Sequence, residues 1–192
     1  MPLILEGIVT TQNEDGTPNI SPMGPAVNRE LTQFLFRPFS TSQTYKNLKR
    51  NGVGVFHVVD DVLLLARAAT HQWDTIPETC PAEVIDGVRL SDTCRWYEFE
   101  VVSIDENSER TSIETRVLHT GKIRDVWGFN RAKHAVLELA VLSTRLFMID
   151  AEEVAREVER LAVMIEKTAG DQERQAFDLL REYIDNYDGS TR

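Results

Sequence analysis

The sequence contains few cysteines and fewer basic than acidic residues, and each feature excludes a class of protein. It has 2 cysteines and 4 histidines among 192 residues, and none of them follows a metal-binding spacing, so no metal site is expected. Cys80 and Cys94 are expected to be free thiols, because a disulfide scaffold needs more cysteines. The net charge of −10 argues against nucleic acid and against an anionic membrane surface, since both attract clusters of Lys and Arg.

Long apolar runs are also missing. The N-terminal stretch MPLILEGIVTT has no basic segment, and Glu6 interrupts its apolar part. We therefore expect neither a signal peptide nor a membrane span, and we expect a cytoplasmic protein. The patterns GxSxG, GxxxxGK[ST] and GxGxxG do not occur, which excludes the familiar serine hydrolase elbow and the common nucleotide-binding folds.

Strand patterns fill most of the first 122 residues. Residues 3–11 are rich in β-branched side chains, and the turn sequence NEDGTP returns the chain into residues 19–23 as a hairpin. Further strands are indicated at 33–37 and 54–59, and an alternating pattern continues through residues 84–122. About six to eight strands predict a mainly β fold with α additions, a closed or split antiparallel barrel.

Helical patterns occur between the strands and dominate the C-terminus. A helix is predicted over 43–51, and a mostly buried one follows Asp60 as its cap, whereas residues 70–83 contain two prolines and are predicted to be a loop. The chain ends in a helical hairpin. We therefore expect a barrel core with short helices over 1–128 and a helical region over 129–192, packed together as a single structural unit.

The stretch from residue 33 to 51 has the composition of a ligand site. An apolar strand is followed by Arg37, then by Ser40, Thr41 and Ser42, and then by a helix. A helix start presents unpaired N–H groups and a positive dipole end, so three hydroxyls and an arginine beside it suit a phosphate. The alternative stays open: the hydroxyls only cap the helix, and Arg37 pairs with a surface carboxylate.

Three sequence blocks resemble a known family. RPFSTSQTYKNL, with SPMGPA at 21–26 before it and GFNRAKHAVLELAVLSTRL at 128–146 after it, resembles the family called domain of unknown function 447. That family is similar to the FMN-binding split barrels, which include flavin reductases and pyridoxamine phosphate oxidases. The resemblance covers nearly the whole chain. It implies a split antiparallel barrel with a C-terminal helical hairpin, and FMN as the ligand.

The resemblance also implies which residues bind the flavin. Around the phosphate it places Arg37, Ser40, Thr41, Ser42 and Thr44. Near the ribityl chain or the ring it places Asn47, Thr10 and Thr11, and along the ring it places Met23 and Gly24. For Met23 and Gly24 the alternative is a turn stiffened by its flanking prolines, without a ligand. No catalytic residue is assigned.

Three functions are compatible with these patterns. The first is an FMN-dependent oxidoreductase of unknown substrate, which needs no protein nucleophile because the flavin carries the chemistry. The second is a non-catalytic protein that binds a flavin, a deazaflavin or haem. The third is a structural or interaction module that works through its helices. A fold alone does not choose among them.

A homodimer is expected from the helix after Asn130. Apolar residues cover so much of its circumference over 130–146 that a second subunit or the C-terminal helices must pack on it. The resemblance implies that two barrels pair, that the flavin lies at the subunit interface, and that Asn130 approaches the partner's flavin. The alternative for Asn130 is a helix cap alone.

Overall fold

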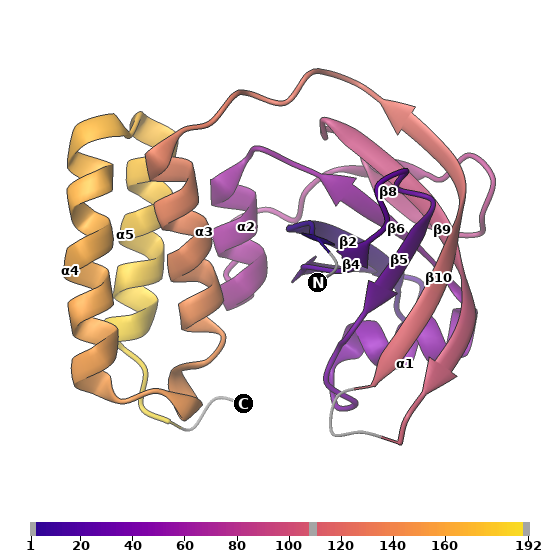
Figure 1. Ribbon diagram of the computed structural model, residues 1–192, viewed down its shortest axis with the longest axis horizontal. Coiled ribbons are helices and arrows are strands. Elements are labelled where there is room, and N and C mark those ends of the chain that lie inside the picture. The colour runs from indigo at the N-terminus through magenta and orange to yellow at the C-terminus, as the bar shows by residue number, and fades with distance from the viewer. Residues whose placement is uncertain (1–2, 108–110, 190–192) are drawn as a thin grey trace. The chain divides into compact units, whose positions relative to one another are not determined.

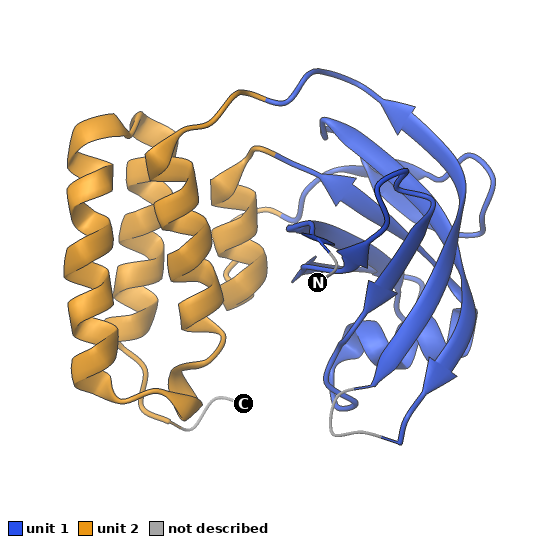
Figure 2. Ribbon diagram, in the orientation of Figure 1, with its two compact units in different colours: residues 1–59, 76–126 blue, residues 60–75, 127–192 orange. Residues whose placement is uncertain are grey.

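The computed structural model describes residues 3–107 and 111–189, and the chain forms two compact units (Figure 2). The first unit comprises residues 1–59 and 76–126, and the second comprises residues 60–75 and 127–192. The chain therefore enters the second unit twice. Residues 60–75 were predicted to belong to the barrel core over 1–128, but they are part of the helical unit.

The first unit is built on a curled antiparallel sheet (Figure 1). Within the described residues the sheet has eight strands in the order β1-β4-β5-β10-β9-β6-β2-β3. Their bounds are Leu3–Ile4 (β1), Gly7–Gln12 (β2), Pro18–Met23 (β3), Ala26–Val27 (β4), Gln33–Phe36 (β5), Val53–Val58 (β6), Arg95–Asp105 (β9) and Ser112–Lys122 (β10). The half-closed sheet confirms the predicted mainly β fold of the split-barrel type, and β2 and β3 form the predicted hairpin.

Alternation along the strands gives the sheet one aromatic face, which is the core of the first unit. Rings pack there with centroids 5.0 to 6.4 Å apart, and they belong to Phe34, Phe36, Phe56, Tyr97 and Phe99. Helix α1 (Gln43–Asn51) adds Tyr45 and Leu48 to this core. Both ends of α1 confirm the sequence prediction, since Ser42 caps its start and Gly52 ends it with φ 71°.

The opposite face of the sheet is covered by the segment from Thr79 to Leu90. The prediction of a loop over 70–83 is wrong at its end, because β7 (Thr79–Pro81) pairs with β8 (Val88–Leu90). The buried carboxylate of Glu98 accepts hydrogen bonds from the backbone N–H groups of residues 83–85 and from the Trp96 indole. Burial alone would raise the pKa of Glu98, but these bonds outweigh it and hold the pKa below its usual value.

His57 fastens the same segment from the centre of the sheet. Its Nδ1 donates to the carbonyl of Ile8 at 3.2 Å, and its Nε2 accepts from the backbone N–H of Leu90 at 3.1 Å. The ring is fully buried, and this burial lowers its pKa to about 3. His57 is therefore a neutral imidazole at physiological pH, with its proton on Nδ1.

The second unit is a bundle of helices. In the described part of the chain it contains α2 (Val62–Thr70), α3 (Arg131–Ser143), α4 (Ala151–Thr168) and α5 (Asp171–Asp185), with a short 3-10 helix over Leu146–Met148. Helices α4 and α5 form the predicted C-terminal hairpin. The cap of α2 is Asp61, not Asp60 as predicted, because the Asp60 carboxylate instead accepts from the backbone N–H of Trp127 at 3.0 Å.

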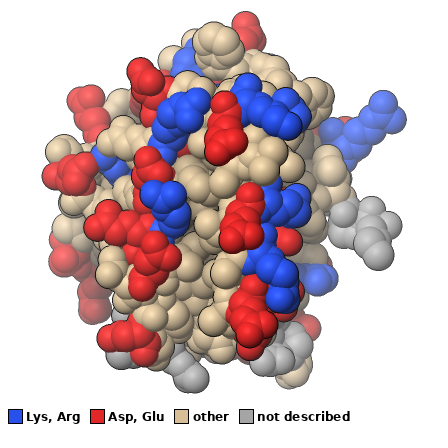
Figure 3. All heavy atoms as spheres, turned by 90° about the vertical axis from the view of Figure 1, so that its left-hand side faces the viewer, with Lys and Arg blue, Asp and Glu red and all other residues tan. Residues whose placement is uncertain are grey.

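Helix α3 is covered by the other helices of its unit. It packs against α2, α4 and α5, and its buried side chains include Ala132, Val136 and Leu139. The wide apolar arc of α3 is thus satisfied within one chain. The surface of this unit carries intermixed acidic and basic side chains (Figure 3), with ion pairs within turns of α4 and α5, such as Glu157 with Arg160.

Candidate functional site

The loop from Arg37 to Ser42 joins β5 to α1 and forms a turn at the helix start. The N–H of Ser42 donates to the carbonyl of Phe39 at 3.0 Å, and the Oγ of Ser42 accepts from the N–H of Tyr45 at 3.2 Å. Because this Oγ accepts in the cap, its own proton is still available for a ligand. We refer to residues 40–42 as the hydroxyl loop.

Unused donors follow one another along the hydroxyl loop and into the start of α1. The first two N–H groups of α1, on Gln43 and Thr44, have no acceptor among the described residues. Arg37, Ser40 and Thr41 are exposed, and within the same part of the chain no side-chain hydrogen bond or ion pair engages them. The first turn of α1 has no acidic residue. Amides, hydroxyls and a guanidinium around a positive helix end form a site for an anion.

A buried polar network supports the start of α1 from below. The side-chain amide of Asn47 donates to Thr11 Oγ1 at 3.0 Å and to Asn13 Oδ1 at 2.9 Å. Asn19 donates to Thr11 Oγ1 and to Thr44 Oγ1, each at 3.1 Å. The structure thus brings Thr11, Thr44 and Asn47 together behind the loop, with their side chains already hydrogen-bonded.

The sequence patterns gave no indication of Asn13 and Asn19 as members of this network. Residues of β3 alternate between two faces, and Asn19 lies opposite Thr11 in the register of the hairpin. Asn19 and Thr11 are polar side chains directly opposite each other on neighbouring strands. Such a cross-strand pair is the signal in the sequence that could have indicated the network.

The remaining residues predicted on the barrel have contacts with other parts of the first unit. Thr10 is wholly buried, and its Oγ1 donates to the carbonyl of Val88 at 2.5 Å, so it fastens the segment from Thr79 to Leu90. Met23 ends the edge strand β3 and is half-buried against the core. Gly24 follows it, and a Cβ there would come within 2.5 Å of the Glu6 carboxylate, so only glycine fits without a shift.

Asn130 belongs to the helical unit and caps α3. Its Oδ1 accepts from the N–H of Lys133 at 3.1 Å, and its Nδ2 donates to the carbonyl of Thr168 at 3.1 Å. Both ends of the amide are therefore engaged in joining the start of α3 to the end of α4. Its predicted approach to a flavin stays a prediction.

The C-terminal half of α1 is anchored to the turn between β9 and β10. The Nζ of Lys49 lies 2.8 Å from Glu106 Oε1, and the hydroxyl of Tyr45 donates to the same carboxylate. The hydrogen bond to Glu106 raises the pKa of Lys49. This anchor holds α1 in place while leaving its first turn open.

Two other kinds of site are absent from the described residues. No group of His, Cys, Asp and Glu side chains there is arranged to hold a metal ion. None of the helices in that part of the chain combines the length and the apolar character that crossing a membrane requires.

The sequence matches two models of one protein family. The N-terminal domain model of the protein of unknown function DUF447 matches residues 5–124, and a second DUF447 model matches residues 130–182. No curated protein matches the chain.

Solved structures share the fold. The crystal structure of the FMN-bound protein MM1853 from Methanosarcina mazei, which carries the same family name, is 25% identical, with a TM-score of 0.81 over 95% of this chain and 96% of that one. Nitrilotriacetate monooxygenase component B from Mycobacterium thermoresistibile is 15% identical, with a TM-score of 0.54 over 64% and 70%. The 2-nitrobenzoate 2-nitroreductase NbaA from Pseudomonas fluorescens is 19% identical, with a TM-score of 0.52 over 64% and 66%. The last two show the shared barrel fold alone.

Proposed function

This chain belongs to the DUF447 family, and from that premise we propose that it is an FMN-binding protein that acts as a flavin-dependent oxidoreductase. The observation that carries the proposal is the set of unused donors at the start of α1, from Arg37 to Thr44. Amides, hydroxyls and a guanidinium that has no ion-pair partner among the described residues together match the terminal phosphate of FMN. The FMN in the crystal structure of the Methanosarcina mazei protein supports the same ligand.

The residues divide into two groups by what they do for the cofactor. We assign the phosphate to Arg37, to the hydroxyls of Ser40, Thr41 and Ser42, and to the first N–H groups of α1. Thr11, Thr44 and Asn47 are already hydrogen-bonded to the chain, so we assign them to positioning the start of α1. Met23 and Gly24, on the edge strand and just after it, are assigned to the ring.

Bound FMN would supply hydride or electron transfer, which none of the side chains of this site provides. The chain's own contribution is to bind the phosphate and to orient the ring. A small redox substrate is the expected partner. The absence of a nucleophile in the assigned site is compatible with this chemistry.

The protein purified without added cofactor should carry FMN or bind it when it is supplied. The measurement is the visible absorption spectrum, followed by titration of flavin fluorescence. Bleaching of the bound flavin by NADH or NADPH would support the redox activity and identify the electron donor. A colourless protein that does not quench flavin fluorescence would remove the proposal, and haem or deazaflavin bands would replace FMN with another cofactor.

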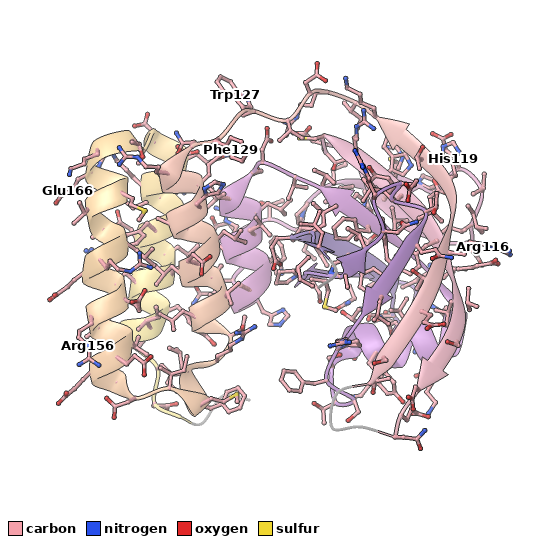
Figure 4. All side chains as sticks on the ribbon, viewed as in Figure 1. Arg116, His119, Trp127, Phe129, Arg156 and Glu166 are labelled. Atoms are coloured by element: carbon pink, nitrogen blue, oxygen red, sulfur yellow. The ribbon has the colours of Figure 1, made fainter. Side chains whose placement is uncertain are left out.

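We also propose a homodimer with the flavin at the subunit interface. The apolar arc of α3 no longer supports it, because α2, α4 and α5 cover that helix. Support comes instead from two aromatic side chains before α3, Trp127 and Phe129, which are 76% and 100% exposed (Figure 4). Large exposed aromatic residues are typical of interfaces.

Dimerisation should then be linked to FMN. If both subunits contact the cofactor, FMN binds the dimer more tightly than the monomer, and added FMN lowers the dimer dissociation constant by mass action. Sedimentation across a dilution series, with and without FMN, measures this. A monomer at every concentration, or a dimer indifferent to FMN, would contradict the shared site and leave the phosphate site standing.

A further inference from the structure

Lys46 lies one helical turn beyond the hydroxyl loop. Its backbone N–H donates to the carbonyl of Ser42 at 3.2 Å, so residue 46 stacks over the cap on the helix surface. Its side chain is exposed, and among the residues that the structure describes it has no hydrogen-bond or ion-pair partner. Side chains of an α-helix lean toward the N-terminus, so the Lys46 ammonium can cover the first turn, where the N–H groups of Gln43 and Thr44 are unused.

The charges near the start of α1 are opposite to those that usually stabilise a helix. Helices α4 and α5 each carry two acidic residues in their first turn, which compensate the positive end of the dipole. Helix α1 has none, and Arg37 before its start and Lys46 in its second turn have no ion-pair partner among the described residues. Cations near the positive end of a helix dipole are electrostatically unfavourable until an anion binds.

We propose that Lys46 is a second phosphate-binding cation, and that with Arg37 it selects a flavin bearing a dianionic phosphate monoester, FMN, over uncharged riboflavin. This inference rests on the proposed function. A phosphate monoester carries about 1.5 to 2 negative charges at pH 7, so a single arginine neutralises only part of it. Two cations, Arg37 before the hydroxyl loop in the sequence and Lys46 one helical turn after it, together match the charge of the ligand.

Lys49 provides a matched control on the same helix. It is three residues further on, but its ammonium is held 2.8 Å from Glu106 and contacts the Tyr45 hydroxyl. Lys49 is thus directed toward the turn between β9 and β10 and away from the hydroxyl loop. Replacing either lysine by glutamine removes one positive charge, so a general effect of net charge is the same in both variants.

The experiment compares the wild type with Lys46→Gln and Lys49→Gln, as full-length protein freed of bound flavin. FMN and riboflavin are titrated separately by fluorescence quenching, at low and at high salt. We expect Lys46→Gln to weaken FMN by about two- to fivefold, the range of a partly screened charge contact, and to leave riboflavin unchanged. The dependence of FMN affinity on salt should also become weaker. Lys49→Gln should leave the ratio of the two affinities unchanged.

Four outcomes would overturn the inference. Equal weakening of FMN and riboflavin by Lys46→Gln would assign Lys46 to the stability of α1, and an equal loss of FMN selectivity in both variants would reduce the effect to net charge. If the wild type and Lys46→Gln bind FMN equally well, the role of Lys46 is rejected and the proposed function is unaffected. A wild type that binds neither flavin rejects the proposed function together with this role.

Discussion

Residues 127–192 produced alone should fail to form a stable helical bundle. They lack α2, whose buried residues Val62 and Leu65 pack in the same unit as α3 and α5. Burial of a Val or Leu side chain is worth about 1.5–3 kcal/mol, so these two residues alone account for roughly 3–6 kcal/mol. The total stability of a small domain is only about 5–15 kcal/mol. The loss of helical circular dichroism and of a cooperative thermal transition would show the failure.

A second fragment, which restores α2, is the matched control. In this fragment, residues 60–75 are joined through a flexible linker to the N-terminus of residues 127–192, so the linker replaces residues 76–126 of the first unit. The fragment should recover helix content and a cooperative thermal transition. The family models divide the chain between residues 124 and 130, so a fragment designed from them alone would omit α2. If both fragments melt cooperatively at the same temperature, α2 is dispensable for the helical unit.

Arg37→Ala should weaken FMN by roughly 10- to 100-fold and riboflavin much less. The lost contact is a charge-assisted bond to the phosphate, worth about 1.5–3 kcal/mol, and riboflavin has no phosphate. The measurement is the ratio of the two dissociation constants from fluorescence titration. The expected effect exceeds that of Lys46→Gln because a guanidinium forms two directed hydrogen bonds to a phosphate.

Arg116→Ala is the control for this change. Arg116 is an exposed arginine of β10 in the same unit (Figure 4). It forms an ion pair with Glu100 of the neighbouring strand. Its removal changes the net charge by the same amount without touching the hydroxyl loop. Equal losses for FMN and riboflavin in Arg37→Ala, or an equal loss of FMN in Arg116→Ala, would mean that Arg37 does not bind the phosphate.

The parts of the fold that local chemistry determines were predictable from the sequence. Ser42 and Gly52 delimit α1 as expected, because a cap hydroxyl and a left-handed glycine act on their immediate neighbours. The hairpin of β2 and β3 follows from its turn residues in the same way. The strand, hydroxyl loop and helix of the candidate site all belong to this local class.

Contacts between distant segments were not predictable from patterns. Asp60 and Asp61 are equally good caps, and the choice depends on Trp127, whose N–H occupies the Asp60 carboxylate from 67 residues away. Nothing in the sequence distinguishes His57 and Glu98 from ordinary polar residues. Their burial depends on hydrogen bonds from backbone N–H groups of the segment from Thr79 to Leu90. The hydrogen bond from Thr10 to the carbonyl of Val88 was not predictable for the same reason, since Val88 is remote in sequence; the predicted contact of Thr10 with the flavin stays a prediction.

The two separate passages of the chain through the helical unit also impose an order on biosynthesis. Helix α2 ends at Thr70 and α5 ends at Asp185, so 185 − 70 = 115 further residues must be translated before the bundle is complete. At about 5–20 residues per second this interval is roughly 6–23 s. Strands β9 and β10 of the sheet are translated during it, and the apolar side of α2 has no partner from the helical unit until α3 leaves the ribosome. The nascent chain therefore exposes the apolar side of α2 from the end of its own translation until α3 has emerged, and ribosome-associated chaperones shield segments of this kind.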